Sequence, residues 1–181
     1  MARLQYAEPS EVGARLRDFL AAEKSKMGRI NNLVKVMSNS PAVLEGYLGL
    51  NGVLDHGALR PELAERLALA VSEANGCDYC LASHGALARH LGISPEETLA
   101  ARRAGSSDPK IDAALKFALA VVDRRGRVSD EELAGAKEAG YTDGEIAEIV
   151  AHVARTILTN YLNNVAATAL DWPALGPLPS A

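Results

Sequence analysis

The stretch PELAERLALAVSEANGCDYCLASH, residues 61–84, decides the fold because it encodes two helices joined by a tight turn. Pro61 suits the first position of a helix, and the apolar run LALAV indicates that this helix is mostly buried. The Asn75-Gly76 pair ends it, since glycine readily adopts the left-handed conformation that closes a helix. We therefore expect a second helix to begin at Cys77.

Helix start signals recur along the rest of the chain, whereas runs of alternating β-branched and aromatic residues are missing. At three starts a serine or aspartate that can cap the helix precedes a proline suited to its first position. Two others have capping-box spacing, Ser or Thr followed three residues later by Glu. The starts are Ser10, the segment NNLVKVMSN, Ser40-Pro41, Ser94-Pro95, Asp108-Pro109, Ser129 and Thr142.

These signals predict an all-α helical bundle of about eight helices, in a single domain that spans residues 1–181. The first helix is expected from Ser10 to about Lys26, and the last long helix ends before Asp171. The Pro-rich tail at 172–181 is expected to be extended.

Composition is typical of a globular protein, with 48% hydrophobic and 23% charged residues. The net charge of −4 gives no reason to expect nucleic acid or an anionic membrane as a partner. No apolar run reaches the ~18 residues of a membrane span, and the N-terminus lacks the apolar core of a signal peptide. Two cysteines are too few for a disulfide-stapled secreted scaffold, so we expect a cytoplasmic protein with reduced thiols.

The two cysteines, Cys77 and Cys80, lie three residues apart, and His84 follows four residues after the second. On a helix these three side chains share one face. The two cysteines are separated by ~4.5 Å of helical rise, within reach of a disulfide. Both lie in the first turn, where unpaired N–H groups and the helix dipole stabilise a thiolate. The spacing therefore indicates a redox-active dithiol.

Three other interpretations of the pair remain open. A structural disulfide would close a tiny loop and constrain the unfolded chain little. A zinc site would need Cys77, Cys80, His84 and His90, although His90 points away from His84 on a continuous helix. Two inert buried cysteines are the last alternative, which the nearby histidine disfavours. No haem, flavin or nicotinamide motif is visible, so we expect neither a cofactor nor a metal.

Glu65 is the acidic residue that we expect beside the dithiol. Glu62 has a natural partner in Arg66 four residues later, whereas Glu65 has none and precedes the apolar run. If the helices on either side of the turn run antiparallel, Glu65 lies ~16 Å from it, His84 ~12 Å and Cys80 ~6 Å. Glu65 would then meet His84 before either sulfur, which predicts a relay of carboxylate, imidazole and thiol. A peripheral Glu65 paired with some basic residue is the alternative.

The last long helix carries a second candidate surface. From Ile149 to Leu170 only Arg155 is charged, yet uncharged polar residues recur every fourth residue. Such residues on a strongly apolar helix suit a buried network, a pocket wall or a subunit interface. They are His152, Thr156, Asn160 and Asn164, with Tyr161 as a further candidate for a pocket wall that also includes Tyr79.

Glu65, twelve positions before Cys77, together with CDYC and then His84, resembles the AhpD-like alkylhydroperoxidases of the carboxymuconolactone decarboxylase superfamily. The core of the resemblance covers about residues 60–92, and most of the chain is similar to the uncharacterised peroxidase-related branch. The resemblance implies that Cys80 is the peroxide-reactive thiol and Cys77 its resolving partner. It also implies that Glu65 and His84 transfer protons.

The resemblance further implies a homo-oligomeric, thiol-dependent peroxidase or disulfide oxidoreductase. Its partners would be a hydroperoxide or other small oxidant and an external dithiol reductant. The decarboxylase branch lacks the cysteine pair, which disfavours lactone decarboxylation here. Well-studied members carry a histidine just before the second cysteine, where this chain has Tyr79. A phenol, with a pKa of ~10, is a poor proton shuttle at neutral pH, so the relay would be shorter or run through water.

The alternative function is non-enzymatic. In that interpretation the chain is a redox- or ligand-sensing helical oligomer that uses the cysteine pair as a switch.

Overall fold

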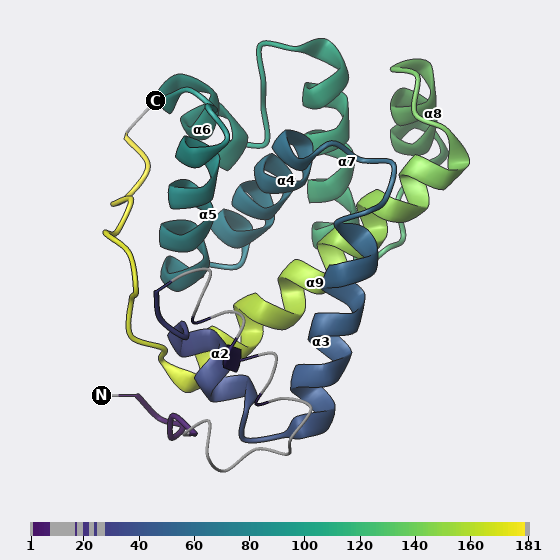
Figure 1. The fold of residues 1–181 in the computed structure, drawn as a ribbon. Coiled ribbons are helices and arrows are strands. Elements are labelled where there is room, and N and C mark those ends of the chain that lie inside the picture. Colours follow the sequence, from purple (N-terminus) through teal and green to yellow (C-terminus); the bar gives the residue numbers. More distant parts are fainter. Residues whose placement is uncertain (1, 8–16, 18–19, 22–23, 25–27, 180–181) are drawn as a thin grey trace.

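The computed structural model describes residues 2–7, 17, 20–21, 24 and 28–179. These residues define eight helices and contain no strand (Figure 1), so the predicted all-α fold is confirmed. The helix predicted from Ser10 to about Lys26 lies mostly outside the described residues. The eight helices are α2 (Asn32–Met37), α3 (Pro41–Leu54), α4 (Pro61–Ala74), α5 (Asp78–His90), α6 (Pro95–Arg102), α7 (Pro109–Arg124), α8 (Asp130–Glu138) and α9 (Asp143–Ala166).

Five of the predicted helix starts are confirmed by their capping hydrogen bonds, each of which typically stabilises a helix by ~1 kcal/mol. At five starts the capping side chain accepts a backbone N–H of the first turn, and at two of these the full capping box is present. Between α4 and α5 the chain turns at Gly76, whose φ of 58° lies in the left-handed region. The capping residues are Ser40, Ser94, Asp108, Ser129 and Thr142.

The apolar helix α4 lies at the centre of the larger hydrophobic core. It packs against α5, α6, α7 and α9 (Figure 1), which explains why the five successive residues LALAV at 67–71 are all apolar and buried. Leu67, Leu69 and Val71 are fully buried, and Leu115 of α7 and Ile149 of α9 complete the same core. None of the helices in the described part of the chain combines the length and apolar character that a membrane crossing requires.

A smaller hydrophobic cluster encloses the dithiol. It is formed by α2, the start of α3 and the start of α5, with side chains of α9 and the tail packed against it. Its buried members include Leu33, Met37, Leu44, Cys77 and Cys80. The two cysteines therefore lie where the start of α5 packs against α2 and the start of α3.

The segment after α9 returns along α5 toward α6 (Figure 1). Leu175 packs on Gly85, where a Cβ atom would lie 2.6 Å from Leu175 Cδ1, so only glycine permits this approach. Arg102 donates a hydrogen bond to the carbonyl oxygen of Gly176 at 2.8 Å. This docking brings Trp172 to the dithiol.

Candidate functional site

The dithiol lies at the start of α5, as predicted. Cys77 is the N-cap residue and Cys80 lies in the first turn, where its backbone N–H donates to Cys77 Sγ at 3.3 Å. Both are free thiols, with exposed fractions of 0% for Cys77 and 2% for Cys80. The two sulfurs are therefore adjacent and shielded from bulk water.

Cys80 borders a cavity of about 720 Å³, which we call the dithiol cavity; Cys77 is not among its lining residues. Side chains from α3, α4, α5, α9 and the tail form its walls. Tyr79, Glu65 and His84 line it, as does His90. No group of three or more metal-ligating side chains is arranged around a common point within the described residues. Further lining residues are Leu33, Tyr47, Asn51, Arg155, Thr159 and Trp172.

Hydrogen bonds and charge lower the pKa of the Cys80 thiol. The Cys77 thiol donates to its sulfur, and the positive charge of His84 and an amide donation from Asn163 Nδ2, at 3.2 Å, act in the same direction. Burial opposes these effects but does not outweigh them. The donation to Cys80, together with burial, raises the pKa of Cys77. Of the two sulfurs, Cys80 is therefore the one held as a thiolate.

Glu65 and His84 form the contact predicted from the turn geometry. His84 Nδ1 lies 2.7 Å from Glu65 Oε2, and both side chains are less than one-fifth exposed. Burial acts to lower the pKa of His84, but the Glu65 carboxylate and the Cys80 thiolate outweigh it, so the pKa is raised. His84 thus contacts the Glu65 carboxylate, and its positive charge favours the thiolate form of Cys80.

Tyr79, which directly precedes Cys80, makes contacts that hold the fold together. Its hydroxyl donates to Asp171 Oδ2 at 2.7 Å and accepts the Leu33 N–H at 3.2 Å. Asp171 also accepts the Asn32 N–H at 2.6 Å, and the Tyr79 ring packs edge-on against Trp172. Burial and the hydrogen bond to Asp171 raise the pKa of Tyr79. The phenol therefore stays protonated and ties the tail to α2.

The buried polar residues of α9 divide between a network and the cavity. Asn160 is fully buried, donates to Ser72 Oγ at 3.1 Å and accepts from Asn75 Nδ2 at 2.9 Å. Asn160 thus belongs to a buried hydrogen-bond network and does not line the cavity. Thr156 does line it. His152 is buried outside the lining, and burial, with the nearby charge of Arg155, lowers its pKa to about 4.

The structure does not place Tyr161 in the cavity wall. Its side chain is 56% exposed on the outer face of α9, because it follows the buried Asn160 by one residue and so points about 100° away from it. Asn164 is also exposed and donates to the carbonyl oxygen of Asn75 at 3.0 Å. The α9 amide at the dithiol is Asn163 instead.

Several residues of the site were not predicted from the sequence. Asn163 had a weak signal, since it follows Thr159 by four residues on an apolar helix and shares its face. Arg155 stood out as the single charged residue between Ile149 and Leu170, but its position in the cavity was not predicted. Tyr47, Asn51 and Trp172 come from distant segments, and no local pattern marks them.

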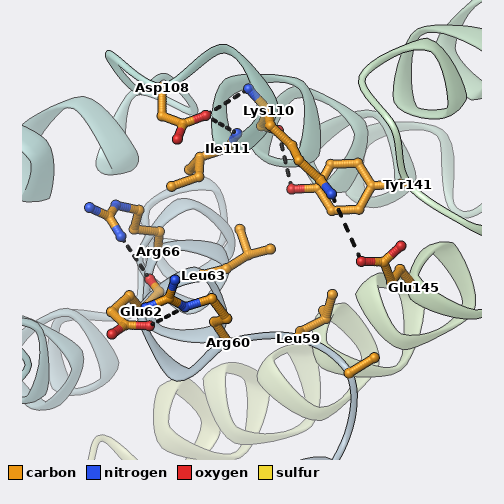
Figure 2. A pocket seen from close by; sticks show the side chains of 11 residues that line it. Leu59, Arg60, Glu62, Leu63, Arg66, Asp108, Lys110, Ile111, Tyr141 and Glu145 are labelled. Carbon is orange, nitrogen blue, oxygen red and sulfur yellow. Dashed lines mark hydrogen bonds and ion pairs between the residues drawn. The ribbon is translucent and has the colours of Figure 1, made fainter.

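A second cavity, of about 400 Å³, lies at the starts of α4 and α7 and is shown in Figure 2. We call it the charged hollow. Arg60 lies 3.4 Å from Glu62, and Lys110 lies 4.0 Å from Glu145 and above the ring of Tyr141. Arg60 and Lys110 are therefore each paired with a carboxylate that also lines the hollow.

The predicted pairing of Glu62 with Arg66 is wrong. The Glu62 carboxylate turns outward to Arg60, and Arg66 pairs with Glu97 at 3.5 Å instead. Arg66 still contacts Glu62 by donating to its main-chain oxygen at 3.1 Å. Glu62 lies in the first turn of α4, and Arg60 directly precedes the helix, so the Glu62 carboxylate can pair with Arg60.

The model of the carboxymuconolactone decarboxylase family matches residues 41–124, which include both cysteines, Glu65 and His84. No relative is found among curated proteins. Solved structures with 18–23% sequence identity share the fold. One is an uncharacterised peroxidase-related protein with an alkylhydroperoxidase AhpD core from Ralstonia eutropha, with a TM-score of 0.85 and 23% identity over 94% of this chain and 92% of that one.

Two further structures extend the comparison. A peroxidase-related protein from Silicibacter sp. has a TM-score of 0.81 and 21% identity, over 92% of this chain and 89% of that one. The debrominase Bmp8 in complex with 2,3,4-tribromopyrrole has a TM-score of 0.79 and 20% identity, over 94% of this chain and 92% of that one. The described helices therefore have the AhpD-like fold.

Proposed function

Because the chain belongs to the AhpD and carboxymuconolactone decarboxylase superfamily, we propose that it is an enzyme that reduces hydroperoxides with its own dithiol. The asymmetry of the two sulfurs carries this proposal. Cys80 borders the dithiol cavity and is the stabilised thiolate, whereas Cys77 lies behind it, buried and protonated. A thiolate is the nucleophile, and a neighbouring thiol allows its oxidised form to close a disulfide. Cys80 is thus the peroxidatic residue and Cys77 the resolving one.

The cycle has three steps. The Cys80 thiolate attacks one peroxide oxygen, so that an S–O bond forms, the O–O bond breaks and the departing alkoxide takes a proton to become an alcohol. Cys77 then loses its proton and attacks the sulfenic acid on Cys80, forming the S–S bond and releasing water. An external dithiol returns two electrons and two protons, a requirement that suits the predicted cytoplasmic location.

His84 carries the proton in this scheme. It takes the proton from the Cys80 thiol, which accounts for a charged imidazole beside a thiolate, and it returns a proton to the alkoxide. Glu65 is a positioning residue, since its carboxylate 2.7 Å from Nδ1 orients the ring and favours the charged form. Tyr79 takes no part in proton transfer because its hydroxyl is committed to Asp171.

The deciding experiment is peroxide consumption by the reduced protein with several dithiol donors, comparing wild type with Cys80→Ser. We expect turnover in the wild type and none in the variant. Since the similar protein Bmp8 is a debrominase, 2,3,4-tribromopyrrole serves as a comparison oxidant. Consumption of the bromopyrrole without consumption of any peroxide would replace our reaction with another two-electron reduction at the same dithiol.

A redox switch without turnover is the second candidate, and one observation favours it. Cys77 is completely buried, so a reductant reaches the disulfide only from the Cys80 side of the cavity. Such a disulfide is long-lived unless the reductant fits the cavity. A single oxidation that no dithiol donor reverses would support the switch, whereas repeated turnover would support the enzyme.

We also propose that the chain forms a homo-oligomer. Large apolar side chains on α9 are exposed at intervals of three to eight residues, and Val53 of α3 is 67% exposed. A second copy would bury this surface. Light scattering on wild type and Leu158→Glu tests it, with a monomeric wild type as the contrary result. The exposed residues on α9 are Val150, Leu158, Tyr161 and Val165.

A further inference from the structure

Arg155 is a buried charge with little to neutralise it. Its exposed fraction is 8%, and its guanidinium donates to Asn51 Oδ1 at 3.0 Å. Among the residues that the structure describes, this is its single hydrogen-bond partner, and no carboxylate forms an ion pair with it. A guanidinium is always charged and has five N–H donors, so most of its binding capacity is unused.

Arg155 lines the dithiol cavity together with Cys80, Glu65, His84 and Asp55. Glu65 and His84 pair with each other at 2.7 Å. Asp55 accepts from Asn51 Nδ2 at 3.3 Å and lies exposed at the end of α3. Asn51 thus bridges Arg155 and the Asp55 carboxylate, which follows α3. A buried cation is unfavourable without an anion bonded to it, and no anion within the described residues is bonded to the Arg155 guanidinium, so a ligand that enters the cavity could supply one.

We propose that Arg155 binds the carboxylate of the substrate, so that the hydroperoxide reduced at Cys80 is that of an organic acid. This inference rests on the proposed peroxidase function. Asn163, which contacts Cys80, lies eight residues beyond Arg155 on α9, a rise of about 12 Å. The carboxylate and the peroxide are therefore several bonds apart, as in a medium-chain fatty-acid hydroperoxide. Leu33 and Trp172 supply apolar wall for the carbon chain between them.

Binding can be measured without any reaction, because Trp172 is the single tryptophan of the chain and lines the cavity. Titration of the reduced wild type with octanoate and with octanamide, followed by Trp172 fluorescence, compares two ligands that differ in charge and hardly in shape. We expect octanoate to bind at least ~10-fold more tightly, since hydrogen bonds to charged groups are stronger than neutral ones. Equal binding, or no binding of octanoate, would overturn the proposal.

Two substitutions of Arg155 and one matched control locate the effect. In Arg155→Gln the preference for octanoate should fall to within ~2-fold of octanamide, and Arg155→Lys should recover part of it, because lysine keeps the charge but not the planar fork. Arg66→Gln removes another largely buried arginine, outside the dithiol cavity, and should keep the wild-type preference. Persistence of the preference in Arg155→Gln would contradict us. If Arg155→Gln does not fold, the proposal is tested by Arg155→Lys and by the comparison of octanoate with octanamide in the wild type.

Kinetics separate this inference from the proposed function. The ratio of kcat/KM values for a medium-chain fatty-acid hydroperoxide and its methyl ester should fall at least ~10-fold in Arg155→Gln, mainly through KM. If no peroxide is consumed but octanoate binding depends on Arg155, the peroxidase proposal fails and the carboxylate site stands. If peroxides are consumed but acid and ester are treated alike, the peroxidase stands and the carboxylate site fails.

Discussion

The dithiol cavity and the charged hollow both contain basic side chains, but they neutralise them differently. In the charged hollow Arg60 has Glu62 and Lys110 has Glu145, so each cation meets a carboxylate (Figure 2). In the dithiol cavity Arg155 donates to an amide and pairs with no carboxylate within the described residues, although Cys80 and the pair of Glu65 and His84 line the same cavity. A cation that is already paired with a carboxylate binds an anionic ligand less readily than an unpaired one.

The difference also concerns solvent. Arg60 and Lys110 have side chains 84% and 48% exposed, so water screens their pairs and each contributes little to stability. The charges of the dithiol cavity are mostly buried, where each unsatisfied group costs stability and each interaction is stronger. Groups that are costly for folding are typical of sites that a ligand or a reaction completes. The contrast therefore assigns chemistry to the dithiol cavity and packing to the charged hollow.

The cysteine substitutions should have the largest effect on this contrast. Cys80→Ser should abolish reaction with peroxide because it removes the nucleophile. Cys77→Ser should react once and stop with Cys80 as a sulfenic acid, which trapping reagents and mass spectrometry detect. Mild oxidation of the wild type should give an intramolecular Cys77–Cys80 disulfide that dithiothreitol reverses. If Cys77→Ser is the inert variant, our assignment of the two roles is reversed.

Removing the relay should have the next largest effect. Glu65→Gln keeps the shape but removes the charge that holds His84, so the pKa of Cys80 should rise toward the ~8.5 of a free thiol. At pH 7 the thiolate fraction then falls from about 0.9 to about 0.03, and we expect oxidation to slow by roughly 30-fold, as in His84→Ala. The rate should recover as the pH is raised through the new pKa. The pH–rate profile of thiol oxidation measures this shift.

A double variant tests whether Glu65 and His84 act as one unit. The variant carrying both Glu65→Gln and His84→Ala should be little slower than either single variant, since the effects of groups that work together are not additive. Multiplicative losses would mean that each residue acts independently. An unchanged pH–rate profile in Glu65→Gln would mean that Glu65 does not affect the pKa of Cys80. The hydrogen bonds from Cys77 and Asn163 would then account for the thiolate.

Much of the fold could be predicted because its signals are local. A cap and its helix lie within four residues, so Ser40, Ser94 and Thr142 marked their helices before any tertiary contact was known. The contact of Glu65 with His84 was predictable for a related reason. Both lie a known number of residues from one tight turn, and helical rise converts that number into distance.

The rest of the site depends on long-range packing that no local pattern encodes. Tyr79 meets Asp171 across 92 residues, and Arg155 meets Asn51 across 104. The periodicity of α9 showed that polar residues were buried but not which element covered them. It also could not separate neighbours on the helix, which is why Tyr161 was expected in a wall that it does not reach.

Substitutions of Tyr79 should have a smaller effect, and on stability. Tyr79→Phe removes two buried hydrogen bonds, one of them to a carboxylate, so the free energy of unfolding should fall by ~1–3 kcal/mol. Chemical denaturation measures the loss, and hydrogen exchange should show it at residues 171–179. The inflection of the pH–rate profile should stay at its wild-type pH. A moved inflection would return Tyr79 to the proton relay.

The smallest effect should come from the charged hollow. Lys110→Met removes an ion pair with a separation of 4.0 Å and a cation–π contact with the ring 4.6 Å away, but it keeps the main-chain oxygen that accepts the Tyr141 hydroxyl. Since the lysine is half exposed, the free energy of unfolding should change by less than ~1 kcal/mol, and by still less at high salt. Urea denaturation at two salt concentrations measures this, with octanoate titration beside it. A much larger loss of stability would contradict the small contribution that we assign to this ion pair. A loss of the preference for octanoate would show that the charged hollow influences ligand binding in the dithiol cavity.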